Sequence, residues 1–499
     1  MAPMLSPARV LPVVLFLGLF AMAARDVVDP DVWWHLETGQ YISEHTRVPR
    51  VDPFSYTRGG APWVAHEWLA DLLLYGIQRV AGWGALIVLF AAIVTASFFV
   101  LYLRCGSRPG LAGLITLLAA CATMPLWGVR PQILSLLLTS LWLLLLERSE
   151  RDPKLLWWTL PLMLLWVNLH AGFALGLALS AVFLAGEWIE GLRRKSARGG
   201  MAPSGISPNP GPLRLAALIF LLDLLLVPLN PNGPRLFDYP LETLRSTAMQ
   251  SYIAEWASPN FHQLESLPLL VLVLASFVIL AWTRSPMRPR DFLLLPVSLF
   301  ASLVSIRLIP FFVLIAAPLL ARQWAGALPS RSGNFSKSSS TSTALHALLN
   351  AGMILTLALF AVVHTIQVIH RQPQAVAQAF PERAVAFLQS HPGLGPIFNH
   401  YDWGGYLIWK LYPETRVFID GRADLYGDSM LDPFASTYQF KGDWRRPLER
   451  WDIHTVLVPS HSALAVGLGN APGWSVAYGD AQAVVLTDRP GSLVTLDTR

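Results

Sequence analysis

Long apolar runs separated by short polar segments dominate the chain. Each run has about the length that crosses the hydrocarbon core of a bilayer as a helix. These runs predict eleven membrane spans, at residues 10–24, 84–103, 110–126, 132–147, 155–168, 171–190, 213–229, 264–282, 291–306, 308–321 and 344–370. The pattern therefore predicts an α-helical polytopic membrane protein.

The segment 63–80 has helical periodicity but is less apolar. Glu67 and Asp71 lie four residues apart, so they share one face of the expected helix. Such a helix suits the outer membrane interface better than the bilayer core, although a span over 63–80 is the alternative. With 63–80 at the interface, the basic loops face the cytoplasm, as the positive-inside rule requires. This topology places the N-terminus inside and the C-terminus outside.

The pattern also divides the chain into parts. Segments rich in Gly, Ser and Pro, within 191–212 and 322–343, are expected to be cytoplasmic linkers. Beyond a transmembrane module over 1–370, short β-prone runs alternate with helix-like stretches, which indicates a small extracytoplasmic α/β domain over 371–499. The runs predicted as strands are Gly395–Asn399, Arg416–Asp420, His454–Pro459, Trp474–Tyr478 and Ala483–Thr487.

Composition agrees with a membrane protein and excludes other classes. Of the 499 residues, 54% are hydrophobic and only 14% are charged. The two cysteines, Cys105 and Cys121, cannot make a disulfide framework or a multi-cysteine metal site. Cytoplasmic loops explain the excess of 37 basic over 32 acidic residues. The sequence has no basic patch with interleaved aromatic residues, which is the feature that would indicate a nucleic-acid partner.

The first loop, 25–83, carries the most concentrated chemistry. Its residues 29–35 read Asp-Pro-Asp-Val-Trp-Trp-His. Carboxylates, indoles and an imidazole beside a membrane surface can act on a lipid headgroup, because indoles settle at the headgroup level and carboxylates reach water. The alternative is structural, with Trp33 and Trp34 as interfacial anchors and Asp29 and Asp31 as acids that stabilise a helix start.

Other polar groups fall on the same side of the membrane as the first loop in this topology. They are His66 with Glu67, Arg130, Asn168 with His170, the turn 230–233, Glu255 with Trp256, and Arg307. Each alone has a structural explanation as a helix end or a turn, but charges in or beside a membrane are often functional. Asp223 is the one carboxylate deep within a predicted span, so it is expected to face the bundle.

In the tail, two polar runs come at expected strand ends, where α/β sheets bind ligands. Residues 399–406 read Asn-His-Tyr-Asp-Trp-Gly-Gly-Tyr and residues 416–422 read Arg-Val-Phe-Ile-Asp-Gly-Arg. The candidate binding residues are Asp402, Trp403, Asp420 and Arg422. A glycine turn packed by its own aromatics is the alternative.

This organisation resembles the GT-C class of membrane glycosyltransferases, which use sugars linked to polyprenyl phosphate. The resemblance rests on a short N-terminus, one span, and an outer loop with an Asp-Pro-Asp motif and amphipathic juxtamembrane helices. The tail is similar to that of the oligosaccharyltransferase catalytic subunit in the order of its acid and aromatic residues over 401–406, followed by a run that ends in Asp420. The double Trp before the acid is missing, which leaves peptide recognition unsupported.

The resemblance implies a catalytic acid in the first loop, with Asp31 as the general base and Asp29 as the less secure match. The reaction must deprotonate an acceptor and stabilise a departing phosphate. Arg130 or Arg307 would bind that phosphate, because Arg suits bidentate contact. Further donor-binding candidates are His35, His66, Glu67 and His170. The acceptor would contact Asp402, Trp403, Asp420 and Arg422.

Metal use is left open by the resemblance. Asp29, Asp31 and Glu67 are the ligands to expect if a divalent cation, Mg²⁺ or Mn²⁺, takes part, because both prefer oxygen ligands.

Two other classes of function are alternatives. A transporter or flippase of lipid-linked sugars would also be polytopic, but internal repeats and broken helices would be expected. A non-catalytic envelope assembly protein would use the α/β domain as a binding head. The resemblance favours an enzyme of the bacterial inner (plasma) membrane, whose partners are the bilayer, a polyprenyl-phosphate-linked sugar and an extracytoplasmic glycan, lipid or protein.

Overall fold

The computed structural model describes residues 7–106, 108–197, 211–282, 287–327, 340–488 and 495–496. The chain divides into two compact units. Unit 1 comprises Met1–Arg25, Ile87–Val227 and Glu255–Ile369, and unit 2 comprises Asp26–Leu86, Pro228–Ala254 and His370–Arg499. The last segment of unit 2 begins at His370. The predicted division differs in one respect, because the structure groups the first loop with the tail rather than with the transmembrane module.

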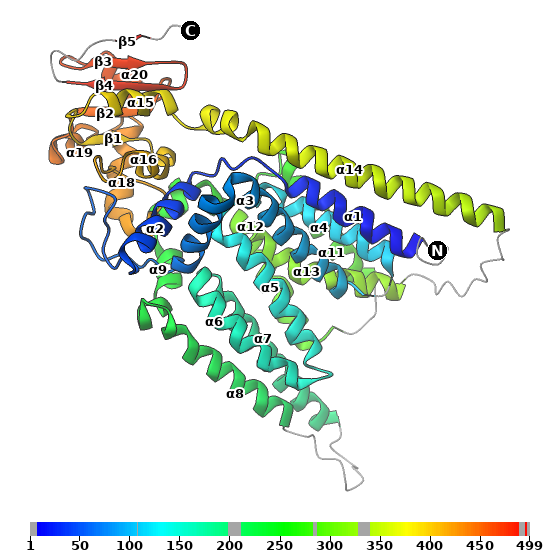
Figure 1. Ribbon diagram of the computed structural model, residues 1–499. Helices are drawn as coiled ribbons and strands as arrows, with labels where there is room; N and C mark the ends of the chain where they lie inside the picture. The colour runs from blue at the N-terminus through cyan, green and yellow to red at the C-terminus, as the bar shows by residue number, and fades with distance from the viewer. Residues whose placement is uncertain are drawn as a thin grey trace. The chain divides into compact units, whose positions relative to one another are not determined.

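Unit 1 is a bundle of helices formed by the apolar runs (Figure 1). Its elements are α1 (Pro7–Ala23), α4 (Pro109–Thr123), η2 (Met124–Leu126), α5 (Pro131–Arg148), η3 (Pro153–Trp158), α6 (Thr159–Leu169), α7 (Phe173–Ala197), α8 (Gly211–Leu226), η7 (Leu264–Ser266), α11 (Leu267–Trp282), α12 (Pro289–Val304), η8 (Ile306–Leu308) and α13 (Ile309–Ala327). Four elements cross the unit boundaries: α3 (Trp68–Arg104), η4 (Val227–Leu229), η6 (Ala254–Trp256) and α14 (Ser340–Ala379). The helix α13 packs against α4, α11 and α12, and its residues Phe312 and Val313 are fully buried.

All eleven predicted spans fall on helices. In the described part of the chain, eight helices are long and apolar enough to cross a membrane. The predicted spans 10–24, 155–168 and 291–306 fall on the shorter helices α1, α6 and α12, which are not among these eight. Asp223 of α8 is buried and accepts a hydrogen bond from Thr159 Oγ1 at 3.0 Å. It therefore faces the bundle, as the sequence predicted.

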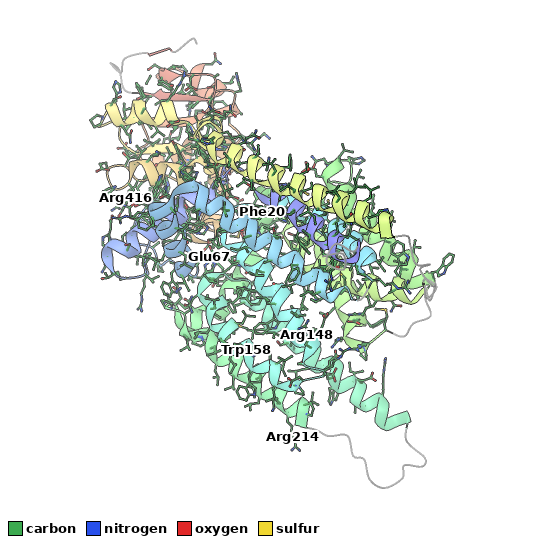
Figure 2. The ribbon with its side chains drawn as sticks, turned by 45° about the vertical axis from the view of Figure 1, so that its right-hand side comes forward. Phe20, Glu67, Arg148, Trp158, Arg214 and Arg416 are labelled. Carbon is green, nitrogen blue, oxygen red and sulfur yellow. The ribbon has the colours of Figure 1, made fainter. Side chains whose placement is uncertain are left out.

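The two ends of unit 1 can be followed in Figure 2. Arg148 ends α5, Trp158 ends η3 and Arg214 lies in the first turn of α8, and all three lie toward one end of the bundle. Phe20, near the C-terminal end of α1, lies toward the other end. The side of the membrane on which each end lies stays a prediction.

Structure extends into both predicted linkers. The helix α7 continues to Ala197, α13 continues to Ala327, and α14 begins at Ser340. The rest of the predicted linkers, 198–210 and 328–339, lies outside the described residues.

The long helix α3 is two helices in sequence. Gly82 has a φ of 71° and a ψ of −173°, so the backbone leaves the helical conformation there. Glycine adopts a positive φ without the steric cost that other residues bear. The segment before Gly82 is thus a separate helix from the apolar segment after it. This break confirms the predicted distinction between 63–80 and the span 84–103, while the position of 63–80 at the membrane interface stays a prediction.

Unit 2 joins the first loop, the segment 228–254 and the tail. Its helical elements are α2 (Asp31–His45), η5 (Gly233–Phe237), α9 (Tyr239–Arg245), α10 (Thr247–Tyr252), α15 (Glu382–Ser390), η9 (Tyr401–Trp403), α16 (Gly404–Leu411), α17 (Ala423–Tyr426), α18 (Asp428–Tyr438), α19 (Arg445–Arg450) and α20 (Ala463–Gly469). Its strands are β1 (Ile397–Asn399), β2 (Thr455–Pro459), β3 (Ser475–Gly479), β4 (Ala483–Thr487) and β5 (Thr495–Leu496).

The strands form one mixed sheet in the order β1-β2-β4-β3-β5. The β2–β4 and β3–β4 pairs are antiparallel, and the β1–β2 and β3–β5 pairs are parallel. The helices α15 and α20 pack against this sheet (Figure 1). Four predicted strands are confirmed, but Arg416–Asp420 is not a strand. In this run only Val417 makes isolated bridges, to Ser55 and to Ile397.

Glu37 on α2 gives unit 2 a predictable pH dependence. Only 6% of the residue is exposed, and burial together with Glu44 raises its pKa from 4.5 to about 8. The folded chain therefore keeps a proton that the unfolded chain releases above about pH 4.5, so the free energy of unfolding should fall as the pH rises from about 5 to 8. In the Glu37→Gln variant, we expect the thermal unfolding midpoint of the purified protein to change less with pH across that range. An unchanged pH profile in this variant would contradict the assignment.

Candidate functional site

The start of α2 orients the two acids of the first loop differently. Asp29 Oδ1 accepts a hydrogen bond from the backbone N–H of Asp31 at 3.0 Å. Asp31 Oδ1 accepts one from the indole Nε1 of Trp34 at 3.2 Å, and Asp31 is half-buried. Asp29 therefore serves the backbone of the helix start, as the structural interpretation expected. Asp31 is held by a side chain and keeps contact with solvent.

Glycines of the tail bring a second segment against this acid. A Cβ atom on Gly421 would lie 1.9 Å from Asp31 Oδ1, and one on Gly405 would lie 2.7 Å from the carbonyl oxygen of Pro30. Only glycine allows such a close approach of backbone. Through Gly405, α16 packs against α2. The two motifs that the sequence singled out in the first loop and in the tail therefore meet within unit 2.

Tyr401 belongs to the same contact. Its hydroxyl donates a hydrogen bond to the carbonyl oxygen of Gly421 at 3.2 Å. Burial raises the pKa of Tyr401 well above its usual value, and the nearby carboxylates of Asp31 and Asp420 raise it further. This phenol is thus a hydrogen-bond donor, and not a base, at any working pH.

A set of neighbouring acids and imidazoles is connected to Asp31 through Trp34. His35 Nδ1 lies 2.6 Å from Asp71 Oδ1, and His35 Nε2 lies 3.6 Å from Glu67 Oε2. The other oxygen of Glu67 lies 3.3 Å from His66 Nε2. The ring of Trp34, which orients Asp31, stacks on His35 with ring centroids 3.6 Å apart. One face of the site is therefore a connected set of titratable groups.

Both nitrogens of each of these histidines face acceptors. His35 lies between two carboxylates, and His66 Nδ1 lies 3.2 Å from the carbonyl oxygen of Val64. A neutral imidazole carries a single N–H, so the protonated form of His66 suits an environment with an acceptor beside each ring nitrogen. Burial opposes the protonation of His66, but Glu67 outweighs that effect and raises the pKa of this imidazole.

A small cavity of about 10 Å³ lies against this set, about the volume that one water needs. Its lining is Trp34, Trp63, Val64, Ala65, His66, Glu67, Asp71, Arg422 and Asp424. The described residues include no group of three or more His, Cys, Asp or Glu placed to hold a metal ion. The predicted metal ligands Asp29, Asp31 and Glu67 therefore do not form such a site here.

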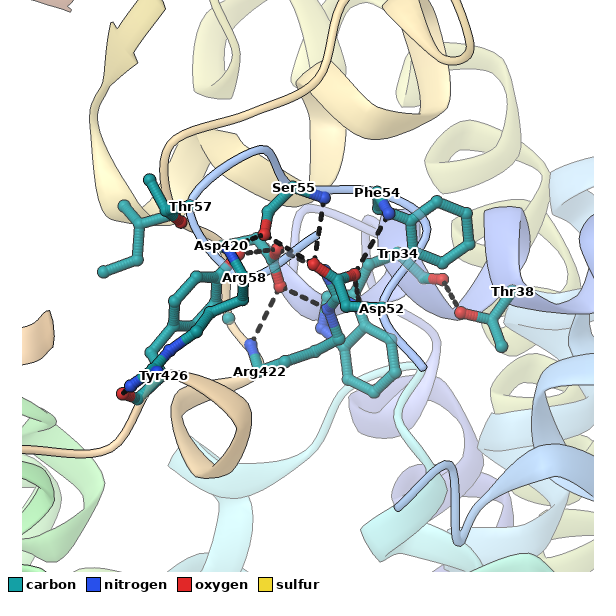
Figure 3. A network of polar contacts seen from close by, with 12 residues as sticks. Trp34, Thr38, Asp52, Phe54, Ser55, Thr57, Arg58, Asp420, Arg422 and Tyr426 are labelled. Carbon is teal, nitrogen blue, oxygen red and sulfur yellow. Dashed lines mark hydrogen bonds and ion pairs between the residues drawn. The ribbon is translucent and has the colours of Figure 1, made fainter. Parts of the chain in front are cut away.

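Arg422 is the centre of a buried ionic network (Figure 3). Its Nη1 lies 2.8 Å from Asp52 Oδ1, and its Nη2 lies 2.7 Å from Asp420 Oδ2. The three side chains have 0% exposure, and Tyr426 donates a hydrogen bond to Asp420 Oδ2 at 2.5 Å. The guanidinium also lies 4.5 Å from the ring centroid of Trp63.

This burial corrects part of the predicted acceptor site. Asp420 and Arg422 have no surface to offer to an acceptor and instead tie the first loop to the tail. Of the other two candidates, Trp403 is 6% exposed and packs edge-on to His400, while Asp402 is exposed. Asp402 is thus the candidate that solvent reaches. Asp52 was not singled out in the sequence, where it precedes Pro53 in an ordinary turn signal.

The buried imidazole of His35 corrects another prediction. Only 3% of this residue is exposed, so it has no surface for a donor phosphate. Its contacts with Asp71, Glu67 and Trp34 make it a positioning residue for the acids around it. Glu67 and His66, each 11% exposed in their side chains, retain a little surface beside the cavity.

Unit 1 contains the two predicted phosphate-binding arginines, and the structure brings them together. Arg130 Nη1 and Nη2 lie 2.5 and 3.0 Å from Glu255 Oε1 and Oε2. Arg307 Nη2 and Nε lie 2.6 and 3.1 Å from Glu255 Oε2. Burial would raise the pKa of Glu255, but the two arginines outweigh it and lower the pKa to about 2. Glu255 is therefore ionised at any physiological pH.

His170, the remaining donor candidate, lies in unit 1 in a separate set of contacts. Its Nδ1 accepts a hydrogen bond from the backbone N–H of Gly172 at 2.9 Å and lies 2.7 Å from Ser135 Oγ. A Cβ on Gly172 would lie 2.3 Å from that oxygen. The accepted N–H bond fixes the neutral ring with its proton on Nε2. These contacts account for His170 as a residue that orders a helix junction.

Comparison with known proteins gives no match in sequence, since no protein-family description and no curated protein matches the chain. Solved structures do match. The archaeal oligosaccharyltransferase AglB from Archaeoglobus fulgidus, in complex with an inhibitory peptide and a dolichol-phosphate, has a TM-score of 0.53 at 11% identity, over 90% of this chain and 69% of AglB. ArnT from Cupriavidus metallidurans, bound to undecaprenyl phosphate, has a TM-score of 0.50 at 13% identity, over 97% of this chain and 98% of ArnT.

At these identities the likeness is one of fold. It extends over most of this chain and covers both the helical bundle and the α/β tail. The predicted resemblance to the GT-C class is therefore confirmed at the level of the fold, that of a polytopic helical membrane protein with a C-terminal α/β domain.

Proposed function

We propose that this chain, which has the fold of GT-C membrane glycosyltransferases, is itself an enzyme that moves a sugar from a polyprenyl-phosphate-linked donor to an extracytoplasmic acceptor. The single observation that carries the proposal is the state of Asp31. It is half-buried, oriented by Trp34 Nε1, and closely approached by the tail at Gly421. A carboxylate that is oriented by a hydrogen bond and still reached by solvent, just after the first apolar helix, suits a general base.

The reaction follows from the chemistry of the donor. The acceptor oxygen or nitrogen attacks the anomeric carbon, and its proton passes to a carboxylate oxygen of Asp31. The bond between the anomeric carbon and the phosphate oxygen breaks, and polyprenyl phosphate leaves with the electron pair. Binding both substrates in line supplies much of the rate enhancement.

The other residues have supporting roles in this proposal. Arg130 and Arg307 would bind the phosphate through charge-assisted hydrogen bonds. Glu67 and His66 would contact the donor, and His35 with Asp71 would keep Glu67 in position. Asp402 would contact the acceptor from the tail.

The location belongs to the same proposal. The eight apolar helices fit a multi-pass membrane protein, and we place it in the bacterial inner membrane with the α/β domain outside. Undecaprenyl phosphate, the lipid in the ArnT structure, is the carrier that we expect the donor to contain. The alternative functions, a lipid-sugar flippase or an envelope assembly protein, have no observation of their own in their favour.

A genetic experiment tests the proposal. Mass spectrometry of cell-envelope glycans should show the loss of one sugar when the gene is deleted, together with accumulation of a polyprenyl-phosphate-linked sugar. The wild-type gene should restore the glycan. A deletion strain with unchanged glycans and unchanged lipid-linked sugars would count against a glycosyltransferase.

A further inference from the structure

We infer that Glu255 restricts the anion site of Arg130 and Arg307 to lipid donors with a single phosphate group. The inference rests on the proposed function, in which these arginines bind the donor. It adds a specificity-determining residue to that site. The donor would be a monophosphate-linked sugar, and diphosphate-linked sugars would be disfavoured.

The geometry makes Glu255 part of the site rather than a neighbour of it. Both of its oxygens are engaged by Arg130, and Oε2 is also engaged by two nitrogens of Arg307. The Arg307 guanidinium lies 5.3 Å from the ring centroid of Trp256, the next residue in the chain. Any phosphate that binds these guanidinium groups must therefore share them with the Glu255 carboxylate.

The charges of the three residues decide which anion fits. Two arginines and one ionised glutamate leave a net charge of one positive unit. A sugar joined to the lipid through one phosphate is a phosphodiester with one negative charge, which this site neutralises. A diphosphate link carries a second negative charge, which would lie close to the Glu255 carboxylate and repel it. Charges of like sign juxtaposed at a recognition site are a common means of rejecting the wrong partner.

The backbone around Glu255 is held independently of its carboxylate. Ser305 Oγ donates a hydrogen bond to the carbonyl oxygen of Glu255 at 3.0 Å, and the N–H of Ile306 donates one to the carbonyl oxygen of Ala257 at 3.0 Å. These bonds connect two segments of unit 1 through main-chain groups. We therefore expect Glu255→Gln to change the charge of the site without removing the anchoring of the loop.

The experiment measures binding of two capped lipids to the full-length protein in nanodiscs. The probes are undecaprenyl methyl phosphate and undecaprenyl methyl diphosphate, which carry one and two negative charges and no sugar. We expect the wild type to bind the monophosphate at least about 10-fold more tightly. Glu255→Gln should reduce this ratio to near unity by improving diphosphate binding, and Glu255→Asp should keep the ratio. Glu265→Gln, an exposed acid of the same unit, is the control and should behave as wild type.

The outcomes distinguish a failure of the role of Glu255 from a failure of the proposed phosphate-binding role of the two arginines. Equal binding of both lipids by the wild type, or an unchanged ratio in Glu255→Gln, would overturn the role of Glu255. If Arg307→Ala weakens binding of both lipids in the same experiment, the phosphate role of the arginines stands whatever the ratio. If Arg307→Ala binds both lipids as the wild type does, the proposed phosphate site is wrong and the inference fails with it.

Discussion

Asp31→Asn should lower the turnover of glycosyl transfer by about 10²–10⁴-fold, the usual contribution of a positioned acid–base group. Asparagine has the same shape and keeps an oxygen that can accept the hydrogen bond from Trp34 Nε1, which is 3.2 Å from Asp31 Oδ1. Only the negative charge and the ability to take a proton are lost. Expression, membrane insertion and donor binding should therefore change little. The measurement is glycosyl transfer per milligram of purified protein.

Asp29→Asn is the matched control for this prediction. Its carboxylate accepts the backbone N–H of Asp31, and an asparagine oxygen can accept the same bond. We expect a small loss of activity. Added Mn²⁺ should restore part of the lost activity only if a cation bridges the two carboxylates. If Asp31→Asn keeps wild-type specific activity and only lowers the yield of protein, Asp31 stabilises a helix start and the general base lies elsewhere. A defect as large in Asp29→Asn would indicate that the two carboxylates act together.

Arg422→Met should destabilise unit 2 by about 3–5 kcal/mol, because the variant leaves two buried carboxylates without their cation. Asp52 and Asp420 have 0% exposure and both lie within 3 Å of the guanidinium. Methionine fills part of the space against Trp63 but cannot compensate for either charge. The expected result is a strongly lowered thermal unfolding midpoint of the purified protein, followed by indole fluorescence, together with low expression.

Two further variants make this prediction specific. Arg416→Met changes an exposed arginine only six residues away, and its effect should be within about 0.5 kcal/mol of zero. Combining Arg422→Met with Asp52→Asn and Asp420→Asn removes the unpaired charges and should recover part of the lost stability. A wild-type midpoint in Arg422→Met would show that the network does not hold the first loop to the tail.

The division into units changes the result expected when the tail is removed. The sequence separated a transmembrane module from a tail beyond residue 370, so truncation after His370 would leave an inserted but inactive membrane part. In the structure, however, unit 2 includes Asp26–Leu86 and Pro228–Ala254 as well as the tail. Its core holds Phe54 of the first loop and Phe418 of the tail, both fully buried. Truncation should therefore unfold the first loop as well.

The sequence by itself determined the elements whose formation is a local matter. An apolar run of sufficient length becomes a helix because a bilayer leaves its backbone no other partners, so every predicted span is a helix. The face shared by Glu67 and Asp71 marked the segment that Gly82 separates from the following apolar helix. Alternating short runs in the tail were enough to predict four strands of the sheet.

Only the tertiary structure decided which of the polar residues act together. Arg416–Asp420 has the composition of a strand. Its last residue, Asp420, instead forms a buried network with Arg422 and Asp52. Asp52 lies 368 positions earlier in the chain than Asp420. Hydrophobic periodicity reports on which face of an element is buried, but it contains no information about the distant partner of a charge. For the same reason the sequence listed Arg130, Glu255 and Arg307 as separate polar groups, whereas the contacts of Glu255 with both arginines became recognisable only once the fold had brought three segments of unit 1 to one point.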